Sequence, residues 1–265
     1  MSIHPKALVS PGARIGSRTT IGAFAIIEDD TVIGDDCHIE ASAQIRAHTS
    51  LGAGCFIGSG ALIGADPQFR GFDRSITSGV RIGERNTLRE YVTVHRSIHQ
   101  GEATVLGNEN YLMAGSHVGH DTVIANENTI ANNVLLAGHV AVGSHCFLGG
   151  GSVFHQFIRI GDYVMAQGNS GFSLDLPPYV IGAGVNEVAG INSVGLRRAG
   201  VSPEVRNQIK ETFRKVYFGA QTLREILDEV DESNLASPLV AFFQFLRQES
   251  KKGLCIRTSR DFKSI

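Results

Sequence analysis

The sequence predicts a mainly β protein, with a parallel β-helix over residues 1–190 and a C-terminal α-helical domain over residues 191–265. Three observations lead to this prediction. Aliphatic residues recur at every sixth position through most of the first part, glycine is abundant at 31 of 265 residues, and helix-start signals gather in the last part. A six-residue period fits neither the 3.6-residue turn of an α-helix nor the simple alternation of a strand.

The hexapeptide repeat runs in two series that are one residue out of phase. Each repeat supplies a short strand and a corner, and three repeats complete a triangular coil that stacks on the next through parallel hydrogen bonds, at roughly 4.8 Å. We expect the aliphatic side chain to point inward, a small residue such as Ala25, Cys37 or Cys146 to follow four positions later, and glycine near the corners to provide positive φ. The aliphatic positions are Val9, Ile15, Ile21, Ile27, Ile33, Ile39, Ile45, Leu51, Ile57 and Ile63, then Ile82, Leu88, Val94, Leu106, Leu112, Val118, Ile124, Ile130, Leu136, Val142, Leu148, Phe154 and Ile160.

Two segments interrupt the repeat and are expected to form loops. Residues 66–79 contain the phase shift, and residues 96–104 place Gln100 where an aliphatic residue is due. Loops on a rigid scaffold often carry function, so both segments are candidates for a binding or catalytic role.

The last part of the chain carries the signals of helices. Ser202 followed by Pro203 is typical of a helix start, with serine as the cap and proline in the first turn. Thr222 and Glu225 form a capping box, and residues 236–249 are a third helical stretch. Basic residues outnumber acidic ones in this domain, whereas the predicted β-helix is acidic.

Composition excludes several functional classes. The formal net charge of −2 argues against a nucleic-acid partner bound through bulk charge. No apolar run approaches the ~20 residues of a transmembrane segment, and the first residues lack the apolar core of a signal peptide. Four cysteines without CxxC spacing indicate neither a disulfide framework nor a zinc ribbon. We therefore expect a cytoplasmic protein.

Histidines cluster in the second half of the predicted β-helix. Because positions 18 apart stack on adjacent coils, His120, Gly138 and Gln156 form one column, next to the column that holds Asp121 and His139. An imidazole beside a carboxylate, one coil from a glycine N–H, can deprotonate a hydroxyl and hold a developing oxyanion. The predicted cluster contains His117, His120, His139 and His155, whereas His95, His99 and His145 are interpreted as ordinary surface residues.

Two patterns allow more than one interpretation. Three converging imidazoles can bind zinc, as in β-helix carbonic anhydrases, although His120 is followed directly by a carboxylate. Arg206, Lys210 and Arg214 are spaced by four and lie on one face of a helix. That face is either plainly solvated or a docking strip for an acidic partner.

Five motifs follow one another at fixed distances: HVGHD at 117–121, LAGHV at 136–140, HQF at 155–157, PPYVI at 177–181 and NSVGLRRAG at 192–200. With the two loops and the helical tail, the whole chain closely resembles the acyl-carrier-protein–UDP-N-acetylglucosamine O-acyltransferase family, which opens lipid A biosynthesis. The resemblance implies a left-handed β-helix and a cytoplasmic homotrimer with active sites between subunits. It also implies that no metal or cofactor is needed, because the acyl group arrives on the phosphopantetheine of acyl carrier protein.

The resemblance also assigns roles to individual residues. His120 is expected to be the general base, steadied by Asp121, and Gly138 is expected to offer its backbone N–H to the oxyanion. Gly168 matches a position that limits the far end of the acyl chain. The expected contacts to the sugar, the nucleotide and the acyl carrier are His117, His139, His155, Gln156, Asn192 and Arg198.

Three positions depart from the family pattern. Phe69 stands where the family has an acidic residue that touches the sugar, which leaves open whether the accepting group is a hydroxyl or an amine. Val194 and Ala199 replace an acid and an arginine that help to hold the nucleotide. The alternatives are therefore N-acylation of an amino-sugar nucleotide, a zinc enzyme of the carbonic anhydrase type, and a structural β-helix that polymerises end to end.

Overall fold

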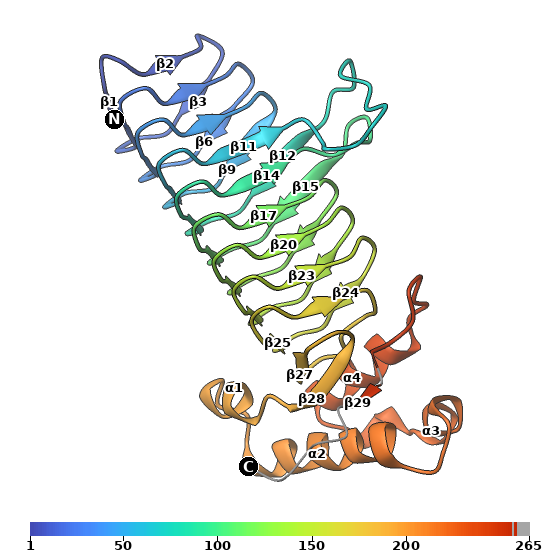
Figure 1. The fold of residues 1–265 in the computed structure, drawn as a ribbon. Helices are drawn as coiled ribbons and strands as arrows, with labels where there is room; N and C mark the ends of the chain where they lie inside the picture. Colours follow the sequence, from blue (N-terminus) through green and yellow to red (C-terminus); the bar gives the residue numbers. More distant parts are fainter. Residues whose placement is uncertain (256, 259–265) are drawn as a thin grey trace.

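The computed structural model describes residues 1–255 and 257–258, which form a long triangular prism with helices packed at the end opposite the N-terminus (Figure 1). Strands of successive coils pair in parallel, and in regular coils the paired residues are 18 apart. Val118, for example, pairs with Leu136, which pairs with Phe154 on the next coil. The prediction of a parallel β-helix followed by a helical region is confirmed.

The three faces of the prism are three sheets, here called sheets A, B and C. Sheet A contains β1 (Ser2–Ile3), β4 (Thr20–Ile21), β7 (His38–Ile39), β10 (Phe56–Ile57), β13 (Thr87–Leu88), β16 (Tyr111–Leu112), β19 (Thr129–Ile130), β22 (Phe147–Leu148), β25 (Met165–Ala166), β27 (Val180–Ala183), β28 (Glu187–Ile191) and β29 (Arg257–Thr258). Sheet B contains β2 (Leu8–Val9), β5 (Ile26–Ile27), β8 (Gln44–Ile45), β11 (Leu62–Ala65), β14 (Thr93–His95), β17 (His117–Val118), β20 (Leu135–Leu136), β23 (Val153–Phe154) and β26 (Gly171–Phe172). Sheet C contains β3 (Arg14–Ile15), β6 (Val32–Ile33), β9 (Thr49–Leu51), β12 (Gly79–Ile82), β15 (Ala103–Leu106), β18 (Val123–Ile124), β21 (Ala141–Val142) and β24 (Arg159–Ile160).

The predicted aliphatic positions line the inside of the prism. Ile57, Leu88 and Leu112 have no exposed surface, and the small residues four positions later, such as Ala25 and Cys37, are equally buried. The interior is therefore a continuous apolar column, and burial of such side chains is the main favourable term in folding.

Glycines near the corners serve a different purpose from the one predicted. The corner residues with positive φ are mostly not glycine; Asp121 and His139 are examples, at φ of 58° and 60°. Gly34 and Gly58, which directly follow the buried aliphatic, lie instead against the next coil, where an added Cβ would fall 2.6 Å from its backbone. Glycine is needed at these positions because adjacent coils approach closely, not because φ is positive.

Both interruptions of the repeat leave the prism at the same edge, between sheet B and sheet C. Residues 66–78 connect β11 to β12, and residues 96–102 connect β14 to β15, as the predicted loops require. Arg96 joins the two loops, because its guanidinium pairs with Asp66 and lies over the ring of Phe72. The edge that carries the loops continues into the corner of His120, between β17 and β18.

The helices pack against one end of the prism around a second apolar core that includes Leu196, Ile209, Ile226 and Phe242. Among the residues described, no helix is both long enough and apolar enough to cross a membrane. The helical elements are α1 (Ser193–Arg198), α2 (Pro203–Phe218), α3 (Leu223–Glu229), the 3₁₀ turn η1 (Glu232–Asn234) and α4 (Ser237–Arg247).

The helix-start signals in the sequence operate as predicted. The Ser202 side chain accepts from the backbone N–H of Val205, and Pro203 occupies the first turn of α2. Thr222 and Glu225 cap α3 reciprocally. These caps satisfy N–H groups that have no partner inside the helix.

Candidate active site

His120 and Asp121 are paired at the corner between β17 and β18. The Nδ1 of His120 lies 2.7 Å from Oδ2 of Asp121, and both side chains are largely enclosed, at 15% and 10% exposed. Because a carboxylate only accepts, Nδ1 carries the proton and Nε2 is left with a free lone pair. This arrangement makes Nε2 available as a base.

Asp121 is held by the loop of residues 96–102 as well as by His120. Its carboxylate accepts a hydrogen bond from the Ser97 hydroxyl and another, 3.2 Å long, from the backbone N–H of Ile98. Burial raises the pKa of Asp121, but the bonds from His120, Ser97 and Ile98 outweigh it and hold the pKa at about 2. The carboxylate is therefore ionised at neutral pH, so it orients His120 and stabilises its protonated form.

Gly138 lies directly beside the imidazole of His120. A Cβ at position 138 would fall 2.5 Å from Cε1 and 2.6 Å from Nε2 of the ring, so any side chain there would displace the base. Within the described part of the chain, the backbone N–H of Gly138 donates no hydrogen bond. An unused N–H at this place can serve an oxyanion formed next to Nε2.

A groove of about 630 Å³ runs along the outer face of sheet B in front of His120. Five of the predicted residues line it: His117, His120, Gly138, His155 and Gln156. Sequence reasoning missed the apolar part of its lining, which includes Leu135 and Val153, 46% and 43% exposed. The signal was an apolar residue at the outward strand position, but Val123 and Phe147 show the same pattern on the other sheets, so the pattern alone does not locate the groove.

The interpretation of His95 as an ordinary surface residue is wrong. His95 is 6% exposed, lines the groove, and lies 5.0 Å from the ring of His117 in an edge-on contact. Burial lowers the pKa of both rings, and that of His117, with further lowering from His95 and His120, falls to about 4. Both imidazoles are therefore neutral at pH 7 and act as hydrogen-bonding groups rather than as charges.

The loop of residues 66–78 also reaches the groove. Phe69, which takes the place of the acidic residue expected from the resemblance, lies with its ring 6.3 Å from that of His120. Phe69 and the neighbouring Gln68 both line the groove. An apolar ring therefore faces the base at this point.

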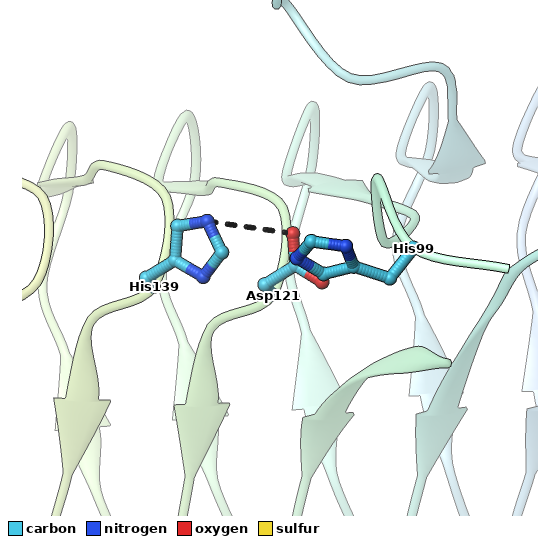
Figure 2. A group of neighbouring side chains, drawn as sticks. All are labelled: His99, Asp121 and His139. Carbon is cyan, nitrogen blue, oxygen red and sulfur yellow. Dashed lines mark ion pairs between the residues drawn. The ribbon is translucent and has the colours of Figure 1, made fainter. Parts of the chain in front are cut away.

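His139 approaches Asp121 from the next coil, with its Nε2 3.8 Å from Oδ2 (Figure 2). It lines a second hollow together with Asp121 and His99, on a different side of Asp121 from the groove. The structure does not form a three-imidazole zinc site among the described residues, because the only potential metal-ligating group there combines two imidazoles with the carboxylate of Asp121.

Several predicted site residues lie outside the groove of this single chain. Gly168 is an exposed corner residue between β25 of sheet A and β26 of sheet B. Asn192 caps α1: its side chain accepts from the N–H of Gly195 and donates to the carbonyl of Tyr163. Arg198 is exposed at the end of α1.

The predicted basic strip lies on α2. Lys210 and Arg214 are exposed, while Arg206 is half-buried and donates to the carbonyl of Val201. The strip is accessible to a partner along most of its length.

Comparison with protein families matches two parts of the chain. Residues 175–255 match the family described as UDP-N-acetylglucosamine O-acyltransferase, domain 2. Residues 30–65 match the bacterial transferase hexapeptide, in six repeats.

Comparison with individual proteins finds similarity over longer stretches. An acyl-[acyl-carrier-protein]–UDP-N-acetylglucosamine O-acyltransferase of Synechocystis is 39% identical over 174 residues, which cover 65% of this chain and 63% of the relative. The aligned segment thus spans less than two thirds of this curated relative. The crystal structure of LpxA, a UDP-N-acetylglucosamine acyltransferase from Bacteroides fragilis, is 37% identical with a TM-score of 0.89, and the match covers 95% of this chain and 98% of that one. The Francisella novicida UDP-N-acetylglucosamine acyltransferase is 30% identical with a TM-score of 0.91, covering 98% and 95%.

Proposed function

Because the chain belongs to the UDP-N-acetylglucosamine O-acyltransferase family, we propose that it transfers an acyl group from acyl carrier protein to the 3-hydroxyl of UDP-N-acetylglucosamine, the first step of lipid A biosynthesis. The observation that carries the proposal is the placement of His120 at the groove. Its Nδ1 is bound to Asp121, while an unused N–H of Gly138 lies beside its free Nε2.

The chemistry follows from these three groups. Nε2 of His120 takes the proton of the sugar hydroxyl, whose oxygen forms a bond to the thioester carbonyl carbon. The resulting oxyanion is stabilised by the N–H of Gly138. When the tetrahedral intermediate collapses, the carbon–sulfur bond breaks and protonated His120 returns the proton to the leaving thiolate. Asp121 remains ionised throughout and stabilises the imidazolium.

The groove offers separate surfaces for the two substrates. Leu135 and Val153 form an apolar strip on sheet B that suits an acyl chain. His117, His155 and Gln156 supply polar contacts near the base for the sugar nucleotide. We assign Asn192, Arg198 and His139 to substrate contacts as well, on the basis of the family pattern alone.

A second acceptor is favoured by one observation. Phe69 faces His120 where the family places an acid that touches the sugar, so the contacts that select a hydroxyl over an amine differ in this chain. N-acylation of a 3-amino-sugar nucleotide by the same base is therefore the alternative reaction.

The partners follow from the proposed reaction. The donor protein is an acidic acyl carrier protein, and the basic strip of Arg206, Lys210 and Arg214 is its proposed docking site. The active form is a cytoplasmic homotrimer in which the corner of one subunit faces the groove of the next. The acyl group arrives on the carrier's phosphopantetheine, so the reaction takes no resident cofactor.

One experiment tests the reaction and its acceptor together. The purified protein is incubated with UDP-N-acetylglucosamine or its 3-amino analogue and with acyl carrier protein thioesters of several chain lengths, and the products are identified by mass spectrometry. We expect an O-acylated sugar nucleotide and release of the free carrier thiol. Efficient acylation of the amine alone would establish the alternative, and no transfer to either sugar would refute acyl transfer.

A further inference from the structure

We propose that His99, Asp121 and His139 form an inhibitory binding site for a divalent transition-metal ion such as Zn²⁺. Figure 2 shows His139 and His99 approaching Asp121, each from a different segment of the chain. Ligand atoms of the three side chains lie within 4.8 Å of one another, and Nε2 of His139 is 3.8 Å from Oδ2 of Asp121. The inhibitory part of the inference rests on the proposed function, because its effect is exerted on His120.

The donor set indicates the class of ion. Two imidazole nitrogens and one carboxylate oxygen are ligands typical of Zn²⁺ and neighbouring first-row ions, which bind nitrogen more readily than Mg²⁺ or Ca²⁺ do. Three protein ligands leave further coordination positions to water. The hollow in which these side chains meet has a volume of about 630 Å³, enough for an ion with its bound water.

Two of the ligands are already held in place. The ring of His139 stacks on Phe157 with centroids 4.5 Å apart and planes only 10° from parallel. Asp121 is fixed by hydrogen bonds from Ser97 and from the N–H of Ile98. Such outer contacts orient metal ligands and lower the cost of bringing them together.

The third ligand comes from the loop of residues 96–102. His99 is exposed, and its backbone N–H donates to the hydroxyl of Ser97, so the loop is anchored one step away from Asp121. Its ring centre is 5.9 Å from that of His139. A rotation of this exposed side chain is sufficient to close the set around one ion.

Other charges border the same hollow. Arg159 is engaged by Asp175 at 2.7 Å, whereas Lys251 and Glu249 line the hollow with opposite charges. His120 faces Asp121 from the side of the groove. The charges of Lys251 and Glu249 oppose one another, which leaves the carboxylate of Asp121 as the principal anionic ligand.

The consequence for the reaction follows from the shared oxygen. Oδ2 of Asp121 is both the acceptor of the His120 hydrogen bond and the oxygen that faces His139. A dication there withdraws negative charge from the oxygen that stabilises protonated His120, so His120 becomes a weaker base and loses part of its orientation. Metal binding is therefore expected to lower kcat, by about 10–100-fold, the range seen when an orienting partner is lost.

The test compares His99→Gln with the matched control His145→Gln. His145 lies at another corner, with its ring stacked on Tyr163 and its Nδ1 3.4 Å from Glu127, so it offers one imidazole and one carboxylate without a third ligand. Each EDTA-treated protein is titrated with ZnCl₂ in a calorimeter, and the O-acylated product is measured with and without ZnCl₂. Neither variant removes a residue of the proposed reaction, and both should retain parental activity without zinc.

We expect one zinc ion per chain in the parent and in His145→Gln, with kcat reduced and restored by EDTA. His99→Gln should need at least about tenfold more zinc for both binding and inhibition. Equal zinc binding by His99→Gln and the parent would overturn the site, and zinc bound through His99 without a fall in kcat would overturn its inhibitory role. Failure of acyl transfer in every zinc-free protein counts against the proposed function alone, since calorimetry still reports on the site.

Discussion

At the scale of single residues, the chemistry depends on the two faces of Asp121. One side of its carboxylate orients His120 toward the groove, and the other lies near His139 and His99. The loop residues Ser97 and Ile98 complete the hydrogen bonds that keep this buried carboxylate ionised. The base is thus supported by a segment that does not belong to the regular repeat.

Replacing the proposed base tests the reaction most directly. His120→Ala is expected to lower kcat by ~10²–10⁴-fold, because removal of a general base has an effect of this size. The fold should persist, since His120 lies at a corner outside the aliphatic core. His145→Ala, at a corner remote from the groove lining, serves as the control and should be nearly silent. A His120→Ala variant with near-parental turnover would exclude His120 as the base.

The buried imidazole of His117 predicts a loss of stability in mild acid. Its pKa is about 4 in the folded chain against an ordinary 6.5, so between these values the unfolded chain binds more protons than the folded one. Stability should therefore fall as the pH drops from about 6.5 toward 4. Ordinary carboxylates titrate mostly below this window.

The measurement is the thermal midpoint between pH 7 and pH 4.5 for the parent and for His117→Gln, which cannot titrate. The variant should lose less stability over this range than the parent does. Identical slopes for the two proteins would show that His117 is not buried in its neutral form.

At the scale of elements, short strands and rigid corners hold the site while α2 presents charge to a partner. Each strand of the regular coils is only two residues long, yet stacking with both neighbours keeps it in register. The helix α2, by contrast, is anchored through Ile209 and Phe213 and leaves Lys210 and Arg214 exposed. Positioning and recruitment are thus assigned to different parts of the chain.

Charge reversal on α2 tests the docking strip. Arg206→Glu, Lys210→Glu and Arg214→Glu together should raise the KM for acyl carrier protein while leaving the KM for the sugar nucleotide unchanged. Exposed ion pairs are each worth only about 0.2–1 kcal/mol, so the combined change is needed. The effect should shrink as salt increases, since charges are screened over about 10 Å at 0.1 M. An unchanged donor KM at low salt would move the docking site elsewhere.

At the scale of the whole molecule, the groove is open on one side and its apolar strip is incomplete. Leu135 and Val153 remain exposed to solvent in the single chain, while Gly168 lies on another edge of the prism. A neighbouring subunit that places its own corner against sheet B would cover these side chains and bring Gly168 to the groove. The proposed homotrimer meets this requirement.

The oligomeric state is measured by sedimentation velocity. We expect a single species with three times the chain mass of 28.4 kDa at concentrations where the protein is active. Burial of apolar surface between subunits is the physical reason for association. Full activity in a monomeric species would refute a site shared between subunits.

The length of the acyl chain provides a second test at this scale. Gly168→Met should shift donor preference toward shorter acyl groups, because a side chain at this corner would block the far end of the groove. A Cβ at this glycine would lie 3.0 Å from the carbonyl oxygen of Gly150, so the side chain must extend outward. The KM for the sugar nucleotide is the internal control. Unchanged donor preference would show that the groove ends elsewhere.

The hexapeptide period by itself determined the prism, its core and the stacking of His120 beside Gly138. Each coil of 18 residues is held by local hydrogen bonds and inward aliphatic side chains, so residue spacing translates directly into position. The pairing of His120 with Asp121 also followed, since both belong to one regular corner.

Only the tertiary structure placed what the two loops contribute. His95 precedes one insertion, and Phe69 and His99 lie inside the insertions, where an 18-residue count no longer relates sequence to space. Their positions depend on contacts between distant segments, such as the pairing of Arg96 with Asp66. The course of a loop is set by such long-range contacts rather than by a repeating local pattern, which is why the groove lining and the metal-ligating cluster emerged only from the folded chain.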